Sequence, residues 1–421
     1  MNKRSEVTKN MLNYLAVFIV FSNSLIYFIN DNFALRISYL IMGSLFLLWI
    51  PVMKDMAFNR VFFIPFFTLV IFSLFNVYAG LDKIELLLKQ VVGISINAAW
   101  FYILIQINDY EIRKLFRIYL NISFLVALIG LFQEISFLFD FKPGYDFSYI
   151  LPFWTFHPAG NILRINSILP EPSGLVVSLM PAAFASLCSL IDKSLELQTK
   201  FRSVVIMIVF ILSFSSTGYA ILIISLFLIL INYKRTRYAS AILIFTVVFA
   251  FFAFRLSPDF RVRVVDSVNI LRTKTNLEDV NYSTYALFSN ALVTKKSLKL
   301  SPLIGTGLGS HEISYARFIP EIKRKEGTHL VNVQDAASLF LRLLSETGVL
   351  GLGLFLFFLL RFYLRKGDRY PVDLWVVNNS IFLYFIIRLL RVGHYFTDGF
   401  FLFFWMYYFS RIKANQEQSL K

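Results

Sequence analysis

Long apolar segments recur from one end of this chain to the other, and they constrain its fold more than any other feature. A helix that crosses the hydrocarbon core of a bilayer needs about 20 mostly apolar residues, at a rise of 1.5 Å each. Such segments lie near residues 11–30, 35–53, 61–79, 85–107, 115–139, 168–191, 203–216, 218–232, 238–254, 338–363, 372–390 and 395–410. The pattern predicts an all-α polytopic membrane protein with about twelve transmembrane helices.

The composition agrees with this prediction. The 421 residues are 57% hydrophobic with a mean hydropathy of +0.65, whereas soluble domains are about 45–50% apolar. The excess of apolar surface has to face lipid. Lys3, Arg4 and Lys9 precede the first apolar segment as in a signal peptide, but no small-residue cleavage site follows. We therefore expect the first helix to be retained.

The basic residues fall into short clusters between apolar segments, which indicates membrane topology rather than binding to nucleic acid. A lysine or arginine at mid-bilayer costs about 2.5–3.5 kcal/mol, and such residues stay in cytoplasmic loops. Residues 203–232 could form one helix or two, but a turn at Ser215–Gly218 keeps every cluster on one side, with both termini cytoplasmic. The clusters are Lys3 to Lys9; Lys54 and Arg60; Arg113, Lys114 and Arg117; Lys193, Lys200 and Arg202; Lys234, Arg235 and Arg237; Arg365, Lys366 and Arg369; Arg411 and Lys413.

This topology divides the chain into three parts. Residues 1–254 hold nine transmembrane helices and a short outer loop at 140–167, and residues 255–337 form a large extracytoplasmic loop. Residues 338–421 hold the last three helices and a cytoplasmic tail. We expect short helices near 283–299 and 311–324 in the large loop. Loops of this length in a compact protein usually carry function.

Charged residues near the outer ends of the predicted helices are the first candidates for chemistry. Such residues are expensive in lipid and normally face a cavity or a partner. Several arginines and carboxylates on one side of the membrane suggest a site for an anionic substrate. They are Arg164, Glu171, Arg342, Glu346, Arg388, Arg391, His394 and Asp398.

Each of these candidates also has a structural explanation, and the sequence leaves the alternatives open. Arg342 and Glu346, spaced i to i+4, would form a buried ion pair that fixes helix packing. Arg388 and Arg391 would be ordinary anchors in the outer leaflet. Glu171, next to a proline, would cap the start of a helix, where a carboxylate is favoured.

The large loop contains alternating glycines, which permit a tight turn or a close approach of the backbone. Gly305, Gly307 and Gly309 precede His311 and Tyr315, without the context of a dinucleotide-binding or P-loop motif. His311 is either a surface histidine or a base. The single Cys188 excludes an intrachain disulfide and structural zinc. We predict no metal and no cofactor.

Two stretches of this sequence resemble the O-antigen polymerase and O-antigen ligase superfamily. The first is Pro302–His311, and the second runs from Asp335 through Arg342 and Glu346 to Gly351. The segment from Arg164 to Glu171-Pro-Ser and the Ser213–Gly218 turn are further landmarks. The resemblance covers about residues 160–363. Ligase-like members usually carry a His-Asn pair where this chain has Ala337 and Ser338, which counts against a ligase.

The resemblance implies a fold similar to lipid-dependent, GT-C-like glycosyltransferases in a bacterial inner membrane. A polymerase of the Wzy kind moves a glycan from undecaprenyl pyrophosphate to a lipid-linked repeat unit of O-antigen or capsule. A ligase delivers the polymer to lipid A core instead. The implied partners are the undecaprenyl-pyrophosphate-linked oligosaccharide, the bilayer and a chain-length regulator protein, with no nucleic acid. A flippase or transporter is an alternative from another class, but the repeated halves typical of transporters are not found.

The resemblance also suggests roles for individual residues. Arginine forks bind phosphate oxygens bidentately and stabilise the charge of the leaving group. A carboxylate or an imidazole would orient or deprotonate the acceptor hydroxyl. Gly305, Gly307, Gly309, Tyr315 and Glu346 would support the site. The expected pyrophosphate contacts are Arg164, Arg317, Arg342, Arg388 and Arg391, and the expected catalytic residues are His311, Glu171 and Asp335.

Overall fold

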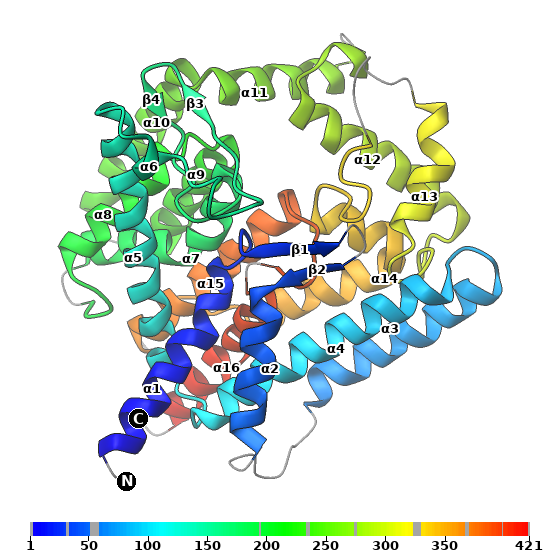
Figure 1. Ribbon diagram of the computed structural model, residues 1–421, viewed down its shortest axis with the longest axis horizontal. Helices are drawn as coiled ribbons and strands as arrows, with labels where there is room; N and C mark the ends of the chain where they lie inside the picture. Colours follow the sequence, from blue (N-terminus) through cyan, green and yellow to red (C-terminus); the bar gives the residue numbers. More distant parts are fainter. Residues whose placement is uncertain are drawn as a thin grey trace.

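The computed structural model describes residues 3–30, 33–50, 59–192, 195–232, 236–272, 276–322, 330–366, 370–397 and 399–419. These residues form a helical protein with two small hairpins (Figure 1). The helices that lie on predicted spans are α1 (Lys3–Phe18), α2 (Ile37–Trp49), α3 (Arg60–Tyr78), α4 (Ile84–Ile107), α5 (Ile112–Leu138), α7 (Pro172–Ile191), α8 (Lys200–Leu212), α9 (Ser216–Asn232), α10 (Thr236–Leu256), α14 (Leu339–Arg361), α15 (Val372–Leu390) and α16 (Phe400–Ser419).

Among the described residues, six helices are long and apolar enough to cross a membrane: α3, α4, α5, α7, α14 and α15. Shorter apolar helices cover Lys9–Phe21, Ile37–Trp49 and Ser216–Asn232. The chain is therefore a multi-pass membrane protein. All twelve predicted segments overlap a helix, including the pair α8 and α9 on either side of the predicted turn. That turn lies slightly earlier than expected, at Ser213–Ser215, where Phe214 has a φ of 46°.

The first predicted span is wrong in its second half. Helix α1 ends at Phe18, a 3₁₀ turn covers Ile19–Phe21, and β1 (Ile26–Asn30) then pairs antiparallel with β2 (Phe33–Arg36). Polar residues at 22–24 interrupt the apolar run, and the Ser22 hydroxyl donates to the carbonyl of Ile19 at 2.9 Å. The branched and aromatic residues that follow suit a strand as well as a helix. The second span consequently begins at Ile37.

The described parts of the two long connections contain regular secondary structure, as predicted. The region 140–167 contains α6 (Lys142–Tyr145) and a hairpin of β3 (Pro158–Ala159) with β4 (Ile162–Leu163). In the large loop, α12 (Tyr282–Leu300) and α13 (His311–Phe318) lie on the predicted short helices. Sequence analysis missed α11 (Pro258–Leu271), which crosses the top of Figure 1 from the α9–α10 side to α12.

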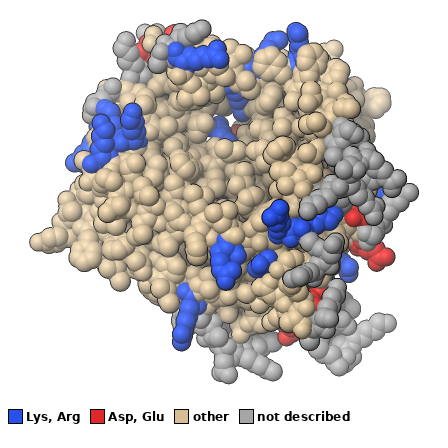
Figure 2. Space-filling model, turned by 180° about the vertical axis from the view of Figure 1, so that it is seen from behind, with Lys and Arg blue, Asp and Glu red and all other residues tan. Residues whose placement is uncertain are grey.

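The two termini lie at the same end of the protein (Figure 1). Arg113, at the start of α5, pairs with Asp373 of α15 and Glu417 of α16. Lys413 of α16 contacts Glu111 in the α4–α5 turn. On the face in Figure 2, Lys and Arg gather in an upper and a lower group with a broad uncharged zone between them. Such a belt suits the hydrocarbon core of a bilayer. From the predicted basic clusters, Lys54, Lys193, Lys234, Arg235 and Arg369 lie outside the described residues.

Helix α7 forms the centre of the bundle, and α3 its margin. In the apolar window of α7, 83% of residues are buried inside the protein, against 17% in α3. Hydrogen bonds inside the bundle satisfy the polar tips of large aromatic residues, as an apolar interior requires. Tyr119 of α5 donates to the Ser178 carbonyl at 2.7 Å, and Trp405 of α16 donates to the Ala98 carbonyl at 2.8 Å. The marginal α3 is thus free to line a cavity with α14.

Candidate functional site

Arg342 lies at the centre of a buried polar cluster at the start of α14. Its Nε donates to Glu346 Oε1 at 2.9 Å, and one terminal nitrogen donates to the Gly393 carbonyl at 3.1 Å. The guanidinium carbon lies 4.1 Å from the centre of the Tyr395 ring, and Tyr395 donates its hydroxyl proton to Glu346 Oε2 at 2.7 Å. The predicted i to i+4 ion pair is therefore present. It also fixes the loop between α15 and α16.

Arg388, near the end of α15, fixes the same loop from the other side. Its guanidinium donates to the Thr397 carbonyl at 3.1 Å, to the His394 carbonyl, and to the Tyr384 hydroxyl at 3.0 Å. Its exposed fraction is zero. The alternative of an outer-leaflet anchor is wrong for Arg388, because the side chain points into the protein. Both arginines shape residues 391–397, which we call the outer loop of α15 after the side of the membrane that the sequence predicts for it.

Asp335 holds this outer loop against the segment that precedes α14. Its Oδ1 accepts from Asn332 Nδ2 at 2.8 Å and from the Ala337 amide at 3.3 Å, and its Oδ2 accepts from the Gly393 amide at 3.3 Å. Ala336 and Ala337 have φ values of 55° and 59°. L-residues rarely adopt this left-handed conformation, which concentrates at functional sites. The region around Asp335 is therefore a strained, tightly held segment.

His394 follows Gly393 and approaches Asp335 with its ring. Nε2 of His394 lies 3.8 Å from Asp335 Oδ2, and the His394 side chain is 42% exposed. Burial, together with the charges of Arg342, Arg388 and Arg36, lowers the pKa of His394 to about 4, although Asp335 acts in the opposite direction. Burial favours the neutral form of Asp335, but His394, Asn332 and Arg342 lower its pKa below the ordinary value. At neutral pH the pair is a carboxylate beside a neutral imidazole.

The glycine-rich segment packs into a break in α14. Gly348 has a φ of 64° and a ψ of −165°, and this interrupts the helix. Amides at the break find acceptors in the segment 302–307, since Val349 donates to the Pro302 carbonyl and Leu350 to the Leu303 carbonyl, both at 3.0 Å. In return the Gly307 amide donates to the Glu346 carbonyl at 2.9 Å. The two segments that carry the family resemblance therefore form one structural unit.

Side chains would not fit at this contact. A Cβ atom on Gly305 would lie 2.5 Å from backbone atoms of Glu346 and Gly348, and one on Gly348 would lie 2.4 Å from the Leu303 carbonyl oxygen. Gly307 approaches Asp82 in the α3–α4 turn, and Gly309 approaches α4. The sequence expectation of a close backbone approach is confirmed. Among the described residues, the groups that approach these glycines belong to the protein itself.

His311, a predicted catalytic candidate, is fully buried and joins three helices. Its Nδ1 is 3.0 Å from the Ser345 hydroxyl of α14, and its Nε2 is 2.9 Å from Asn290 Oδ1 of α12. Burial and the charge of Arg342 lower the pKa of His311 to about 3. The alternative of a surface histidine is wrong. Because both ring nitrogens are engaged, the imidazole is not open to an acceptor, and Tyr315 on the next turn is buried as well.

The remaining predicted residues lie on several other elements. Arg391 is half-buried, donates to the Ser283 carbonyl of α12 at 3.4 Å, and interacts electrostatically with Glu171 and Asp335. Glu171 is exposed at the start of α7 and makes no capping hydrogen bond with its side chain. The predicted position is confirmed, since Glu171 is the N-cap residue of α7, but its carboxylate accepts from the Ser173 hydroxyl and not from a helix amide.

Arg164 and Arg317 belong to other segments of the chain than Arg342 and Arg388. Arg164 is half-buried in the region 140–167 and acts electrostatically on Tyr219 of α9. Arg263 of α11 donates to the Ser216 hydroxyl at the start of α9. An arginine other than the predicted Arg164 therefore contacts the end of the predicted serine turn. Arg317 is exposed on α13. Asp398 lies outside the described residues.

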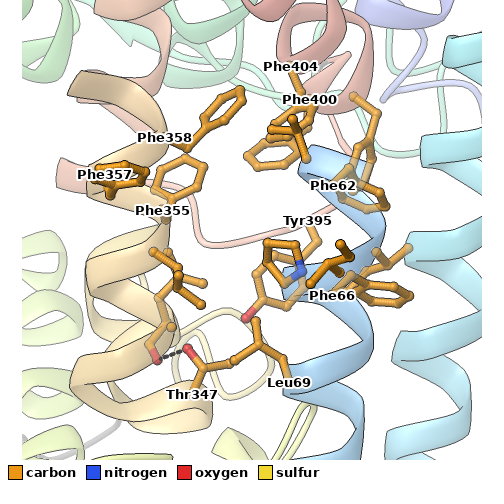
Figure 3. Close-up of a pocket in the computed structure, with 18 of the residues that line it drawn as sticks. Phe62, Phe66, Leu69, Thr347, Phe355, Phe357, Phe358, Tyr395, Phe400 and Phe404 are labelled. Atoms are coloured by element: carbon orange, nitrogen blue, oxygen red, sulfur yellow. Dashed lines mark hydrogen bonds between the residues drawn. The ribbon is translucent and has the colours of Figure 1, made fainter. Parts of the chain in front are cut away.

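A large apolar cavity adjoins the polar cluster (Figure 3). It has a volume of about 420 Å³ and lies between α3, α14 and α16. Val61, Ile64 and Phe357, which line it, are also exposed at the surface, so the cavity opens sideways on lipid-facing helices. Tyr395 lies in its middle. Other residues that line it are Arg60, Phe62, Phe66, Leu69, Leu308, Leu343, Thr347, Leu354, Phe355, Phe358, Phe400 and Phe404.

Sequence reasoning missed two residues at this site. Tyr395 connects the cavity to Glu346, but one tyrosine among 21 gives no signal. Arg36, at the start of α2, acts electrostatically on His394. Its signal was present, because a basic residue at the outer end of a predicted span departs from the rule that places lysine and arginine in cytoplasmic loops. Among the described residues, no group of three His, Cys, Asp or Glu could hold a metal ion.

Comparison with known proteins adds no assignment. A scan against protein-family models gave no match, and neither did a search of curated proteins. The resemblance to the O-antigen polymerase and ligase superfamily thus stays a prediction that rests on the residues quoted for it.

Proposed function

We propose that this protein is a glycosyltransferase that polymerises polysaccharide repeat units, taking a glycan from undecaprenyl pyrophosphate and transferring it to a lipid-linked acceptor. One observation carries the proposal: an apolar cavity that opens toward lipid reaches, at Tyr395, a buried cluster of arginines and carboxylates. A polyprenyl pyrophosphate has the same two parts. Its hydrocarbon chain needs an apolar groove that opens to the bilayer, and its phosphates need cations.

The dimensions of the cavity suit a hydrocarbon chain. The lining residues of α3 extend from Arg60 to Leu69, which is about 14 Å at 1.5 Å per residue. Each CH₂ group removed from water contributes about 0.8 kcal/mol, but a polyprenyl chain would reach the cavity from the bilayer. Transfer from the bilayer gains less than transfer from water. The aromatic walls, with Phe62, Phe66, Phe355 and Phe358, would favour the occupant through close packing (Figure 3).

The topology that goes with this proposal has twelve membrane-crossing helices and both termini in the cytoplasm. The six long helices are supplemented by α1, α2, α8, α9, α10 and α16. Residues 140–167 and 255–337 then lie outside the membrane, on the side where undecaprenyl-linked repeat units are joined. The common end of the two termini and the ion pairs of Arg113 and Lys413 support this arrangement.

The arginines divide into two roles under this proposal. Arg342 and Arg388 are buried and hold the outer loop of α15, so they act as positioning residues. Arg391 and Arg36 are half-buried and lie around His394 or Glu171, where a pyrophosphate could reach their guanidinium groups. Two such cations would offset the negative charge that develops on the leaving group as the glycosidic bond to phosphate breaks.

The test is reconstitution. Purified protein in liposomes receives undecaprenyl-pyrophosphate-linked repeat units, and products are separated by length on a gel. A ladder of longer lipid-linked glycans is expected, and Arg391→Ala should shorten it while Arg317→Ala, on the exposed face of α13, leaves it less affected. Absence of any new glycosidic bond with the wild-type protein would overturn the proposal.

A deletion strain separates the polymerase from its alternatives. Loss of a polymerase leaves lipid A core with a single repeat unit, and loss of a ligase leaves polymer on the undecaprenyl carrier. Loss of a flippase yields neither product. The first pattern is expected here, and either of the others would replace the proposed function with that of the corresponding class.

A further inference from the structure

His394 and Asp335 come from different segments of the chain and approach each other at the site. Asp335 precedes α14, and His394 lies in the outer loop of α15. A backbone contact joins these segments, since the Val392 amide donates to the Ala337 carbonyl at 3.1 Å, and the Gly393 amide donates to Oδ2 of the Asp335 side chain at 3.3 Å. These contacts of Val392 and Gly393 hold the two segments together in addition to the approach of His394 to Asp335.

The two side chains differ in exposure: Asp335 is buried, and His394 is partly exposed, as a residue that contacts an acceptor has to be. Asp335 is 5% exposed and already accepts three hydrogen bonds from Asn332, Ala337 and Gly393. The His394 side chain is 42% exposed. A buried, fixed carboxylate next to a partly exposed imidazole is the arrangement in which the carboxylate orients the ring and stabilises it once it is protonated.

We infer that His394 is the general base of the transfer and that Asp335 is its positioning residue, with a sugar hydroxyl of the acceptor as the group deprotonated. This inference rests on the proposed function and names the acceptor side of the same site. His311 does not compete for the role, because Ser345 and Asn290 occupy both of its nitrogens. The position where ligase-like members carry a histidine is Ala337, which touches the outer loop of α15 through its carbonyl.

The proton has a defined path. With Nε2 directed at Asp335, the Nδ1 lone pair remains for the acceptor, and no hydrogen bond among the described residues involves that atom. The acceptor oxygen forms a bond to the anomeric carbon while its proton passes to Nδ1. The bond from the anomeric carbon to the phosphate oxygen breaks, and its electron pair stays on polyprenyl pyrophosphate. Asp335 then faces an imidazolium, and the proton leaves to water.

The separation of 3.8 Å between Nε2 and Oδ2 exceeds a hydrogen bond, as is frequent at catalytic pairs without substrate. Arg342, Arg388 and Arg36 also face the imidazole electrostatically and favour its neutral, proton-accepting form. A bound pyrophosphate would offset part of this positive charge and so make the imidazole a stronger base when the donor is in place.

The experiment compares His394→Gln, His394→Ala and Asp335→Asn with wild-type protein in the reconstituted transfer assay. A general base contributes about 10²- to 10⁴-fold, so the His394 variants should lower kcat by at least about 100-fold while binding of the lipid-linked donor is retained. Added imidazole should partly restore the rate of His394→Ala. His157→Gln, which changes a histidine that contacts Thr155, is the matched control and should keep the wild-type rate.

The pH profile gives a second readout that a merely structural role would not move. For wild-type protein, kcat/KM should fall as the pH drops toward the pKa of His394, about 4, because the protonated ring cannot accept a proton. That acidic decline should be absent in the residual activity of His394→Gln. A kcat within threefold of wild type in both His394 variants, with the acidic decline unchanged, would overturn the assignment and leave the proposed function in place. Inactive wild-type protein would overturn both.

Discussion

Gly393 and Asp335 touch backbone to backbone: a Cβ atom on Gly393 would lie 1.7 Å from the carbonyl oxygen of Asp335. The contact joins residues 58 positions apart and fixes the distance between the outer loop of α15 and the segment that precedes α14. No rotation of a side chain can relieve a clash with backbone. Glycine is therefore required here by the close approach, and any larger residue has to push the loop away from the cluster.

Gly393→Ala should consequently lower the rate of transfer by about 100-fold or more, because a displacement of 1 Å at a catalytic group can lower a rate by that factor. The measurement is the reconstituted transfer rate together with thermal unfolding in detergent. Gly353→Ala is the control, since Gly353 lies in α14 with open space around its Cβ position. It should leave activity unchanged and, through the better helix propensity of alanine, slightly raise stability. Equal activity in the two variants would contradict the role assigned to this contact.

The sequence predicted the helices better than it predicted their mutual contacts. Each of the twelve predicted apolar segments overlaps a helix, and six of these helices are long and apolar enough to cross a membrane, because apolar periodicity is a local signal. The alternating glycines showed that a backbone approaches closely at residues 305–309, but not that its partner is the break in α14 at Gly348. That pairing arises from packing between distant segments, for which one sequence carries no local signal.

At the site, too, local features were predictable from the sequence and contacts between distant segments were not. Arg342 and Glu346 are four residues apart on one helix, so their ion pair was predictable from spacing. Arg388 was a candidate because of its charge, yet its full burial depends on how the outer loop of α15 folds over it. Tyr395 and the apolar cavity had no sequence signal, because a cavity is formed by the relative placement of α3, α14 and α16.

The Arg342–Glu346 pair leads to a second prediction. Arg342→Met leaves Glu346 buried without its partner, and breaking a buried pair in this way costs about 3–5 kcal/mol. The double variant Arg342→Met, Glu346→Leu should recover most of that stability, because both charges are gone. Thermal unfolding of the single and double variants in one detergent checks this.

The double variant should nevertheless remain poor in transfer. Arg342 also donates to the Gly393 carbonyl, and a hydrogen bond from a charged group contributes about 1.5–3 kcal/mol, or roughly 10- to 100-fold in rate if it acts on the transition state. Recovery of both stability and full activity would show that the pair serves helix packing alone.

A third prediction concerns the apolar cavity. Leu354 lines it, and Leu354→Trp should fill part of its volume of about 420 Å³ and compete with a polyprenyl chain. The KM for the long-chain donor should rise by about tenfold or more with little change in kcat, which is the signature of lost substrate binding. A short-chain donor analogue should be used equally well by both proteins. Leu356→Trp is the control, because Leu356 is exposed on the same helix and does not line the cavity.

Asp82, in the turn between α3 and α4, is the source of a fourth prediction. It is 5% exposed, and its Oδ2 has no hydrogen-bond partner among the described residues. Burial raises the pKa of Asp82 to about 7, the carboxylates of Glu346 and Glu312 act in the same direction, and the amide of Lys83 opposes them. Between pH 4 and pH 7 the folded protein thus keeps a proton that the unfolded chain has lost. The contribution of Asp82 to stability therefore falls as the pH rises through this window.

Asp82→Asn should remove this dependence, because an amide does not ionise and can still accept from the Lys83 amide. A pKa difference of about three units corresponds to roughly 4 kcal/mol at most, so the variant should unfold at a higher temperature than wild type at pH 8 and at a similar one at pH 4. Thermal unfolding in detergent across this range measures it. Asp109→Asn, at a side chain that is 87% exposed, should leave the wild-type slope unchanged. The same slope in Asp82→Asn would mean that another group controls the stability of the contact between the α3–α4 turn and the glycine-rich segment.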